Sequence, residues 1–375
     1  MDFTLTEEQT AVRDLARKIL EDLATNERLK TVEATEPVFD RELWGELARA
    51  NLLGAALPET HGGSGMGFFT LCVLLEEIGR AVAPISAPES LLAPLPIARF
   101  GDDALKQHWL PAVAAGEVVL TAALQEPGNG DLTRPLVEAH SENDGYTLHG
   151  EKLLVAAAPI ADAILVPARI AGGGAGLFIV ERDASGVVIE STATTNRQAH
   201  ANLCLEGTRI DASARVGNDD APVLAWLTER ATAAVCAVQL GVSDRALSMT
   251  ADYAKERVQF DRPIGSFQAV HQRAADAYIQ LQAIRLTTCH AALLLDAEEP
   301  AEDAVAVAKY WAAAGGQFLG YACQHLHGGI GIDVDYPMHR YYLWAKQNEL
   351  TLGSAPLQLE RLGARLADGN LVSAN

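Results

Sequence analysis

Hydrophobic and polar positions divide the chain into a helical region, a strand-rich region and a second helical region. Residues 1–116 carry apolar residues three and four positions apart, which predicts amphipathic helices, the first of them capped at Thr6. Residues 117–222 contain short apolar or β-branched runs, and residues 223–375 return to the helical period. Strands inserted between two helical regions predict a mainly α fold with an inserted β domain, and not an alternating βαβ sheet.

The strand-rich region is typical of a small antiparallel sandwich or barrel, because turn residues separate its apolar runs. The runs are Val118 to Leu124, Tyr146 to Leu148, Leu153 to Val155, Ala163 to Val166, Leu177 to Val180 and Val187 to Ile189.

Residues 253–268 read Tyr-Ala-Lys-Glu-Arg-Val-Gln-Phe-Asp-Arg-Pro-Ile-Gly-Ser-Phe-Gln. This segment predicts a long helix that ends in basic and aromatic residues, stops at Pro263, and turns at Gly265 and Ser266 into a second helix. The second helix has one apolar face that is expected to be buried. Its members are Phe267, Val270, Ala274, Ala277, Leu281 and Ile284.

Composition narrows the classes of partner. The 375 residues suffice for two or three domains, and the net charge of −20 argues against nucleic acid or an anionic membrane as partner. The cysteines are scattered and odd in number, which predicts reduced thiols, and no histidine or cysteine spacing suits a metal site. The acidic N-terminus has no signal-peptide pattern, and no uncharged apolar run reaches about 18 residues, so a cytoplasmic protein is expected.

Motifs along nearly the whole chain, with residues 253–268 the most specific, resemble the acyl-CoA dehydrogenase family. The others are Leu57-Pro58-Glu59 with its glycine loop, Glu76-Glu77-Ile78-Gly79-Arg80, Leu124-Gln125-Glu126-Pro127-Gly128, Gly150-Glu151-Lys152, His327-Gly328-Gly329-Ile330-Gly331 and Tyr336-Pro337-Met338-His339-Arg340. The resemblance implies an N-terminal helical domain (1–116), a central β-barrel or sandwich (117–222) and a C-terminal four-helix bundle (223–375).

The resemblance also implies a reaction, the FAD-dependent desaturation of an acyl-CoA thioester. In the family a glutamate removes the α-proton while hydride leaves Cβ for the flavin, and hydrogen bonds to the thioester oxygen stabilise the developing charge. An electron-transferring flavoprotein is the acceptor that the family uses. Oligomerisation is expected, because family members share flavin sites between subunits.

The sequence departs from the family at the base. Leu352 occupies the position of the usual glutamate, and Ala231 occupies the position of a second known arrangement. Neither side chain can take a proton. Glu349, about one helical turn before Leu352, and Glu229, two residues before Ala231, are the candidate replacements.

The flavin contacts depart unevenly. Where the family places hydroxyls and an aromatic residue against a subunit's own FAD, this chain has Gln125, Asp131, Leu154 and Ala156, and an aspartate would repel a pyrophosphate. The residues that family members extend into the neighbouring subunit's FAD are retained. They are Arg257, Phe260, Gln268, Gly328 and Gly329, with His325 in place of a glutamine.

Three interpretations follow. The pattern resembles the non-catalytic subunit of heterotetrameric α2β2 acyl-CoA dehydrogenases, which bacteria use on sterol side-chain CoA esters, and such a chain completes the FAD site of a homologous dehydrogenase subunit. A self-sufficient homotetramer with Glu349 or Glu229 as a displaced base is the second interpretation. The third is a family member without a base that has a binding role or another flavin chemistry.

Overall fold

The computed structural model describes residues 3–142, 144–218 and 222–369, so the outermost residues of the predicted first and third domains lie outside the described part. Contacts group the chain into two compact units. One contains Met1–Arg28, Cys72–Ala83 and Thr232–Asn375, and the other contains Leu29–Leu71 and Pro84–Ala231. The predicted domain boundaries after residues 116 and 222 remain a prediction.

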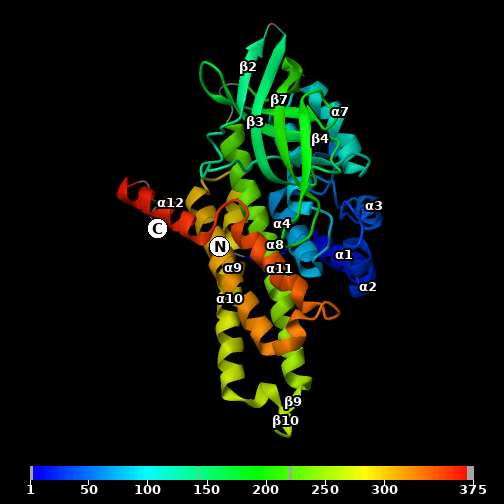
Figure 1. Cartoon of the computed structure of the whole chain (residues 1–375), viewed down its shortest axis with the longest axis vertical. Helices are drawn as coiled ribbons and strands as arrows, with labels where there is room; N and C mark the ends of the chain where they lie inside the picture. Colours follow the sequence, from blue (N-terminus) through cyan, green and yellow to red (C-terminus); the bar gives the residue numbers. More distant parts are fainter. Residues whose placement is uncertain (1–2, 143, 219–221, 370–375) are drawn as a thin grey trace. The chain divides into compact units, whose positions relative to one another are not determined.

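Helices make up the N-terminal and C-terminal parts of the chain, as the periodicity predicts (Figure 1). The α-helices are α1 (Glu7–Leu23), α2 (Asn26–Glu33), α3 (Arg41–Arg49), α4 (Gly67–Ala81), α5 (Ala87–Leu92), α6 (Pro94–Phe100), α7 (Asp103–Ala114), α8 (Val223–Glu256), α9 (Gln268–Asp296), α10 (Glu302–His327), α11 (Met338–Leu350) and α12 (Ala355–Ala367). The predicted cap at Thr6 is confirmed: its hydroxyl accepts from the Gln9 N–H, and the Gln9 side chain accepts from the Thr6 N–H.

Helix α8 is long and apolar enough to cross a membrane by length and composition, but 78% of its most apolar window is buried within the protein. A core helix of a globular bundle has the same properties. In the same unit, α9 and α10 lie side by side as long antiparallel rods (Figure 1).

The Glu76–Arg80 motif proves to be structural. Its glutamates form ion pairs with two other helices, Glu77 with Arg17 of α1 at 2.6 Å and Glu76 with Arg285 of α9 at 3.0 Å. Helices α4 and α8 touch through their backbones, because a Cβ at Gly241 would lie 1.8 Å from the Glu76 carbonyl oxygen. Glycine is therefore required at this crossing.

The predicted helix–turn–helix at residues 253–268 contains an element that the sequence did not predict. Helix α8 ends at Glu256, and two short strands, β9 (Val258–Gln259) and β10 (Arg262–Pro263), pair antiparallel before a 3-10 turn, η3 (Ile264–Ser266), leads into α9. Only the later part of the predicted apolar face of α9 is fully buried, from Ala277 onward. On other faces of α9, Tyr278, Ile279 and Leu286 are more than half exposed.

The strand-rich region forms one sheet in the second unit. Its strands are β1 (Leu120–Ala122), β2 (Glu138–Glu142), β3 (Gly145–Ala156), β4 (Ala163–Ile170), β5 (Ala175–Glu181), β6 (Val187–Thr192), β7 (His200–Asp211) and β8 (Arg215–Val216). They follow the order β6-β7-β3-β2-β4-β5-β8, with β1 also paired to β4. The expectation of a purely antiparallel domain is corrected: β1 and β2 both pair parallel with β4.

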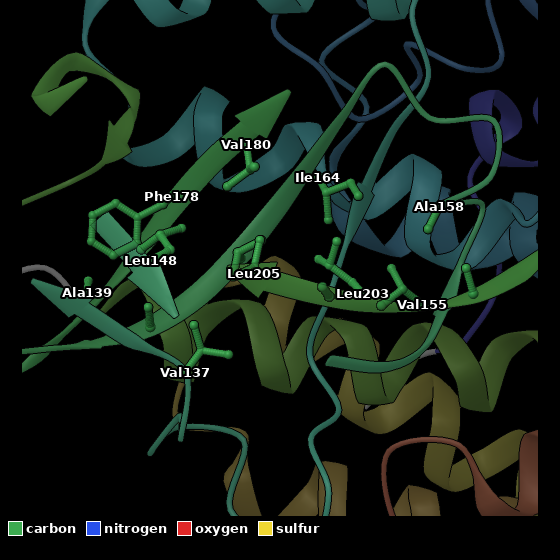
Figure 2. Packing of buried hydrophobic residues seen from close by; sticks show 14 residues of the cluster. Val137, Ala139, Leu148, Val155, Ala158, Ile164, Phe178, Val180, Leu203 and Leu205 are labelled. Atoms are coloured by element: carbon green, nitrogen blue, oxygen red, sulfur yellow. The ribbon is translucent and has the colours of Figure 1, made fainter. Parts of the chain in front are cut away.

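The core of this sheet is made of inward-facing side chains from several strands (Figure 2). Leu148 on β3, Ile164 on β4, Phe178 on β5 and Leu203 on β7 are fully or almost fully buried. Their burial explains why a run of otherwise short strands holds together, since each contributes alternate residues to one apolar cluster.

Candidate functional site

The hairpin of β9 and β10 carries two of the predicted flavin contacts. Arg257 follows the last residue of α8, its N–H donates to the Tyr253 carbonyl at 2.8 Å, and its carbonyl accepts from Ile264 at 2.8 Å. The backbone is thus fixed while the side chain is exposed. Within the described residues, the Arg257 guanidinium makes no ion pair with Glu256 or Asp261, so its charge is available to another molecule.

Phe260 lies at the tip of this hairpin in an unfavourable conformation. Its side chain is 86% exposed, and both loop residues, Phe260 and Asp261, have positive φ values of 52° and 62°. Such two-residue loops favour asparagine and glycine, and a phenylalanine there is uncommon. Phe267 supports the loop, with its ring 6.1 Å from that of Phe260 and 4.1 Å from the Arg262 guanidinium. An exposed aromatic residue held at positive φ is a feature of binding sites.

The glycine turn after α10 exposes its backbone to solvent, whereas the hairpin exposes side chains. Gly328 has φ of 64° and ψ of −139°, a conformation that only glycine adopts readily. Packing within the chain does not explain the glycine at 329, because a Cβ there would meet nothing within 4 Å, and the same holds at 328. A Cβ at Gly331 would lie 3.1 Å from Gln324 and His327. A side chain at residue 331 would therefore be tightly packed, whereas Gly329 leaves the backbone exposed to solvent.

The other two predicted contacts are exposed and lie beside these elements. Gln268 is the first residue of α9, directly after η3, and His325 lies in the last turn of α10, where its carbonyl accepts the Gly328 N–H. The predicted residues therefore form two groups within one unit, one at the hairpin and one at the glycine turn.

The loop that begins at Gln125, which in the family contacts the subunit's own flavin, is held by ion pairs and hydrogen bonds within the chain. Glu126 and Lys152 form a fully buried ion pair at 2.7 Å, which joins the two sequence motifs that contain them. Glu126 also accepts from the N–H groups of Leu136 and Val137 and from the Asn129 amide. Burial lowers the pKa of Lys152 to about 8, against the raising effect of Glu126. For Glu126, burial acts to raise the pKa, but the Lys152 charge and these hydrogen bonds outweigh it, and the pKa is lowered.

The positions that depart from the family pattern lie in the same loop and on β3. Asp131 accepts from both the N–H and the hydroxyl of Thr133, so its carboxylate stabilises the loop itself. Leu154 lies at a bulge of β3 with φ of 51° and is partly exposed, and Ala156 is buried. Neither side chain can donate a hydrogen bond to a cofactor or stack on its ring.

Neither family base position carries a titratable side chain, and the two candidate glutamates lie in different surroundings. Leu352 is buried and has φ of 57° just after α11, and Ala231 is buried within α8. Glu349 is 13% exposed and pairs with Lys346 at 2.8 Å, beside a small surface hollow lined by Gly316, Gly320 and Tyr342. Glu229 is half-buried and belongs to the other compact unit.

The end of α11, next to Leu352, is fixed by a buried lysine that the sequence interpretation missed. Lys309 of α10 donates to the carbonyl oxygens of Asn348 at 2.7 Å and Glu349 at 3.2 Å. Burial lowers the pKa of Lys309 to about 8. Its position in the middle of an apolar helical face was the signal that could have identified it.

A helical bundle, a central mixed sheet and an exposed Arg–Phe hairpin beside a glycine turn define a protein with the acyl-CoA dehydrogenase fold. The chain belongs to the acyl-CoA dehydrogenase family: the family's N-terminal domain model matches residues 6–117 and its C-terminal domain model matches residues 223–367.

Its relatives include acyl-CoA dehydrogenase FadE27 of Mycobacterium tuberculosis, which is 41% identical over 377 aligned residues, covering 98% of this chain and 99% of the relative. Among solved structures, a chain of a variant Tcur3481–Tcur3483 steroid ACAD is similar with a TM-score of 0.92 and 45% identity. A chain of the ChsE4–ChsE5 complex from M. tuberculosis is similar with a TM-score of 0.93 and 42% identity. Each structural match covers 98% of this chain and 99% of the other.

Proposed function

We propose that this chain is the base-lacking subunit of a heteromeric acyl-CoA dehydrogenase and that it completes the FAD site of a homologous partner subunit. The observation that carries the proposal is an asymmetry between two sets of residues. Arg257, Phe260 and the glycine turn at residues 328–329 are open to another molecule. In the loop around Glu126 and Asp131, by contrast, the two carboxylates contact other groups of the same chain: Glu126 pairs with Lys152, and Asp131 accepts a hydrogen bond from the Thr133 hydroxyl.

The chemistry of FAD fits the first set and not the second. An unpaired guanidinium at Arg257 suits a pyrophosphate, the exposed Phe260 ring suits a planar heterocycle, and the bare backbone at Gly329 admits close approach. Asp131 would instead bring a negative charge to the pyrophosphate. When bound, FAD accepts the hydride that leaves the acyl chain, and the residues of this chain contribute binding and orientation.

The relatives support a two-chain assembly and a class of substrate. The Tcur3481–Tcur3483 steroid ACAD and the ChsE4–ChsE5 complex each combine two named components, and this chain is similar to one chain of each over nearly its whole length. We extend from them the proposal that the assembly desaturates the CoA ester of a steroid side chain. The electron acceptor proposed, an electron-transferring flavoprotein, rests on the family alone.

The first test is the flavin content of the chain purified alone and after co-expression with a homologous dehydrogenase subunit. The proposal expects a colourless chain alone and a yellow, active complex in which Arg257→Ala reduces the FAD content. A chain that purifies alone with one FAD per protomer would overturn it.

The rival interpretation, a displaced base in a self-sufficient enzyme, is tested by Glu349→Gln and Glu229→Gln. Because Glu349 is paired with Lys346, we expect turnover of the complex to stay within about twofold of wild type. A loss of about a hundredfold or more in either variant would identify that carboxylate as the base and favour the rival.

A further inference from the structure

A group of three aromatic residues, of which the central His327 is buried and the two tyrosines are partly buried, lies between the two sets of candidate FAD contacts. It consists of Tyr253 in the last turns of α8, His327 at the end of α10, and Tyr336, which follows the glycine turn. The Tyr253 and His327 rings stack with centroids 4.5 Å apart and planes 23° apart, and the His327 and Tyr336 rings are 5.3 Å apart. The three rings thus form one contiguous cluster within one compact unit, called the stack below, in which Tyr253 and His327 are stacked and Tyr336 is tilted by 48° against His327.

The hydrogen bonds of this stack define the tautomer of His327. Its Nδ1 lies 2.8 Å from the Cys323 carbonyl oxygen, which can only accept, so Nδ1 carries the proton. Nε2 is then an acceptor, and the Tyr336 hydroxyl donates to it at 3.2 Å. The Tyr253 hydroxyl donates to the His327 carbonyl at 3.4 Å. Burial lowers the pKa of His327, which keeps the ring neutral and this arrangement intact.

Two members of the stack, Tyr253 and His327, adjoin candidate binding elements in the sequence. The Tyr253 carbonyl accepts the N–H of Arg257 in the last backbone hydrogen bond of the helix, so Tyr253 lies one turn before the start of the β9–β10 hairpin. His327 immediately precedes Gly328, and its own backbone carbonyl is held by Tyr253. Within the described residues, this stack is a direct side-chain link between the hairpin end of α8 and the glycine turn.

We infer that Tyr253, His327 and Tyr336 form a positioning unit that holds the Arg257–Phe260 hairpin and the Gly328–Gly329 turn at one spacing, so that both meet the partner's FAD. This inference rests on the proposed function. The three residues touch no cofactor themselves. They act through the backbone of Arg257 and Gly328.

The test is the FAD affinity of the co-expressed complex, measured by reconstituting the flavin-free complex and following flavin fluorescence. Tyr336→Phe removes one hydroxyl from the stack and should weaken FAD binding by about tenfold, the effect of one lost hydrogen bond. His327→Asn keeps a donor toward Cys323 but removes the acceptor for Tyr336, and should produce a similar loss. Because the two act as one unit, the double variant should lose far less than the product of the two.

The matched control is Tyr341→Phe. Tyr341 is buried in the same compact unit. Its hydroxyl donates to the Arg80 carbonyl at 2.9 Å, and Arg245 acts on both Tyr341 and Tyr336. It should lower thermal stability as much as Tyr336→Phe does while leaving FAD affinity unchanged.

A pH series adds a second readout. The wild-type complex should lose FAD affinity as His327 becomes protonated below neutral pH, and His327→Asn should lack that dependence. The titratable and charged groups that act on Tyr336 are Tyr253, Glu256 and Arg245.

The outcomes separate the inference from the function it rests on. Equal FAD affinity in wild type and Tyr336→Phe, or equal losses in Tyr336→Phe and Tyr341→Phe, would overturn the positioning role and leave the proposed function standing. A wild-type complex without FAD would overturn both.

Discussion

The buried Lys152 and Glu126 neutralise each other's charge. Lys152 and Glu126 are both removed from solvent, and each would be an uncompensated charge without the other. The family motifs that contain them are therefore needed for folding whether or not this chain binds its own flavin.

Lys152→Met should lower the free energy of unfolding by roughly 3–5 kcal/mol, because it leaves the Glu126 carboxylate buried without its counter-charge. Urea unfolding at neutral pH measures the change. Lys255→Met is the control: Lys255 pairs with Asp252 at 3.0 Å on the exposed surface, and its loss should change stability by about 0.5 kcal/mol or less. Similar effects in the two variants would show that the buried pair contributes no more than a surface pair.

Glu89 on α5 is a buried carboxyl group without a counter-charge among the described residues, and it predicts that stability depends on pH. Burial raises its pKa to about 7, and no described side chain gives it a counter-charge. The folded chain therefore holds a proton between about pH 4.5 and 7 that the unfolded chain has released, so the free energy of unfolding falls progressively as pH rises from about 4.5 to about 7. Relative to wild type, Glu89→Gln should gain about 1–3 kcal/mol of stability between pH 5 and pH 8. The exposed Glu59→Gln should show no such trend.

At the scale of elements, the sequence predicted most helices because their apolar positions repeat three and four apart. The strands were harder. Strand β2 carries only one buried residue, Ala139, in an otherwise polar segment, so no apolar run marks it. Strand β7 alternates buried and exposed residues over much of its length, a period-2 signal that a search for continuous apolar runs misses.

The site was predictable only where residue type decides the chemistry. Arg257, Phe260 and Gln268 could be selected from the sequence, since the proposed binding groups are their side chains. The β9–β10 hairpin could not, because two-residue strands have no periodicity and its loop lacks the asparagine–glycine pair that marks such turns. The roles of Tyr253 and Tyr336 depend on contacts between distant segments, which no local pattern contains.

The crossing of α4 and α8 gives a prediction at this scale. Gly241→Ala should destabilise the chain by about 1–3 kcal/mol or more, because the new Cβ meets the backbone of Glu76 and the helices must move apart. Thermal unfolding of the isolated chain measures this. Gly45→Ala in α3 is the control, since its Cβ would meet nothing within 4 Å, and it should stabilise the helix by about 0.5–1 kcal/mol. A neutral Gly241→Ala would mean that the helices separate without loss.

At the scale of the whole molecule, the proposed function makes activity a property of two chains, so restoring one missing group should not restore the enzyme. Leu352→Glu returns a carboxylate to the family's base position, yet Gln125, Asp131 and Leu154 still give that side no hydroxyl or aromatic contact for a flavin. We expect the isolated variant to remain colourless and inactive, and the complex to keep its FAD content and its turnover within about twofold. Leu352→Gln is the control, because glutamine matches glutamate in size and polarity but cannot act as a base. It separates the effect of burying a polar group from any gain in turnover. If Leu352→Glu alone, and not Leu352→Gln, bound FAD and desaturated an acyl-CoA, the loss of the base would be the only defect of this subunit, and its dependence on a partner would be refuted.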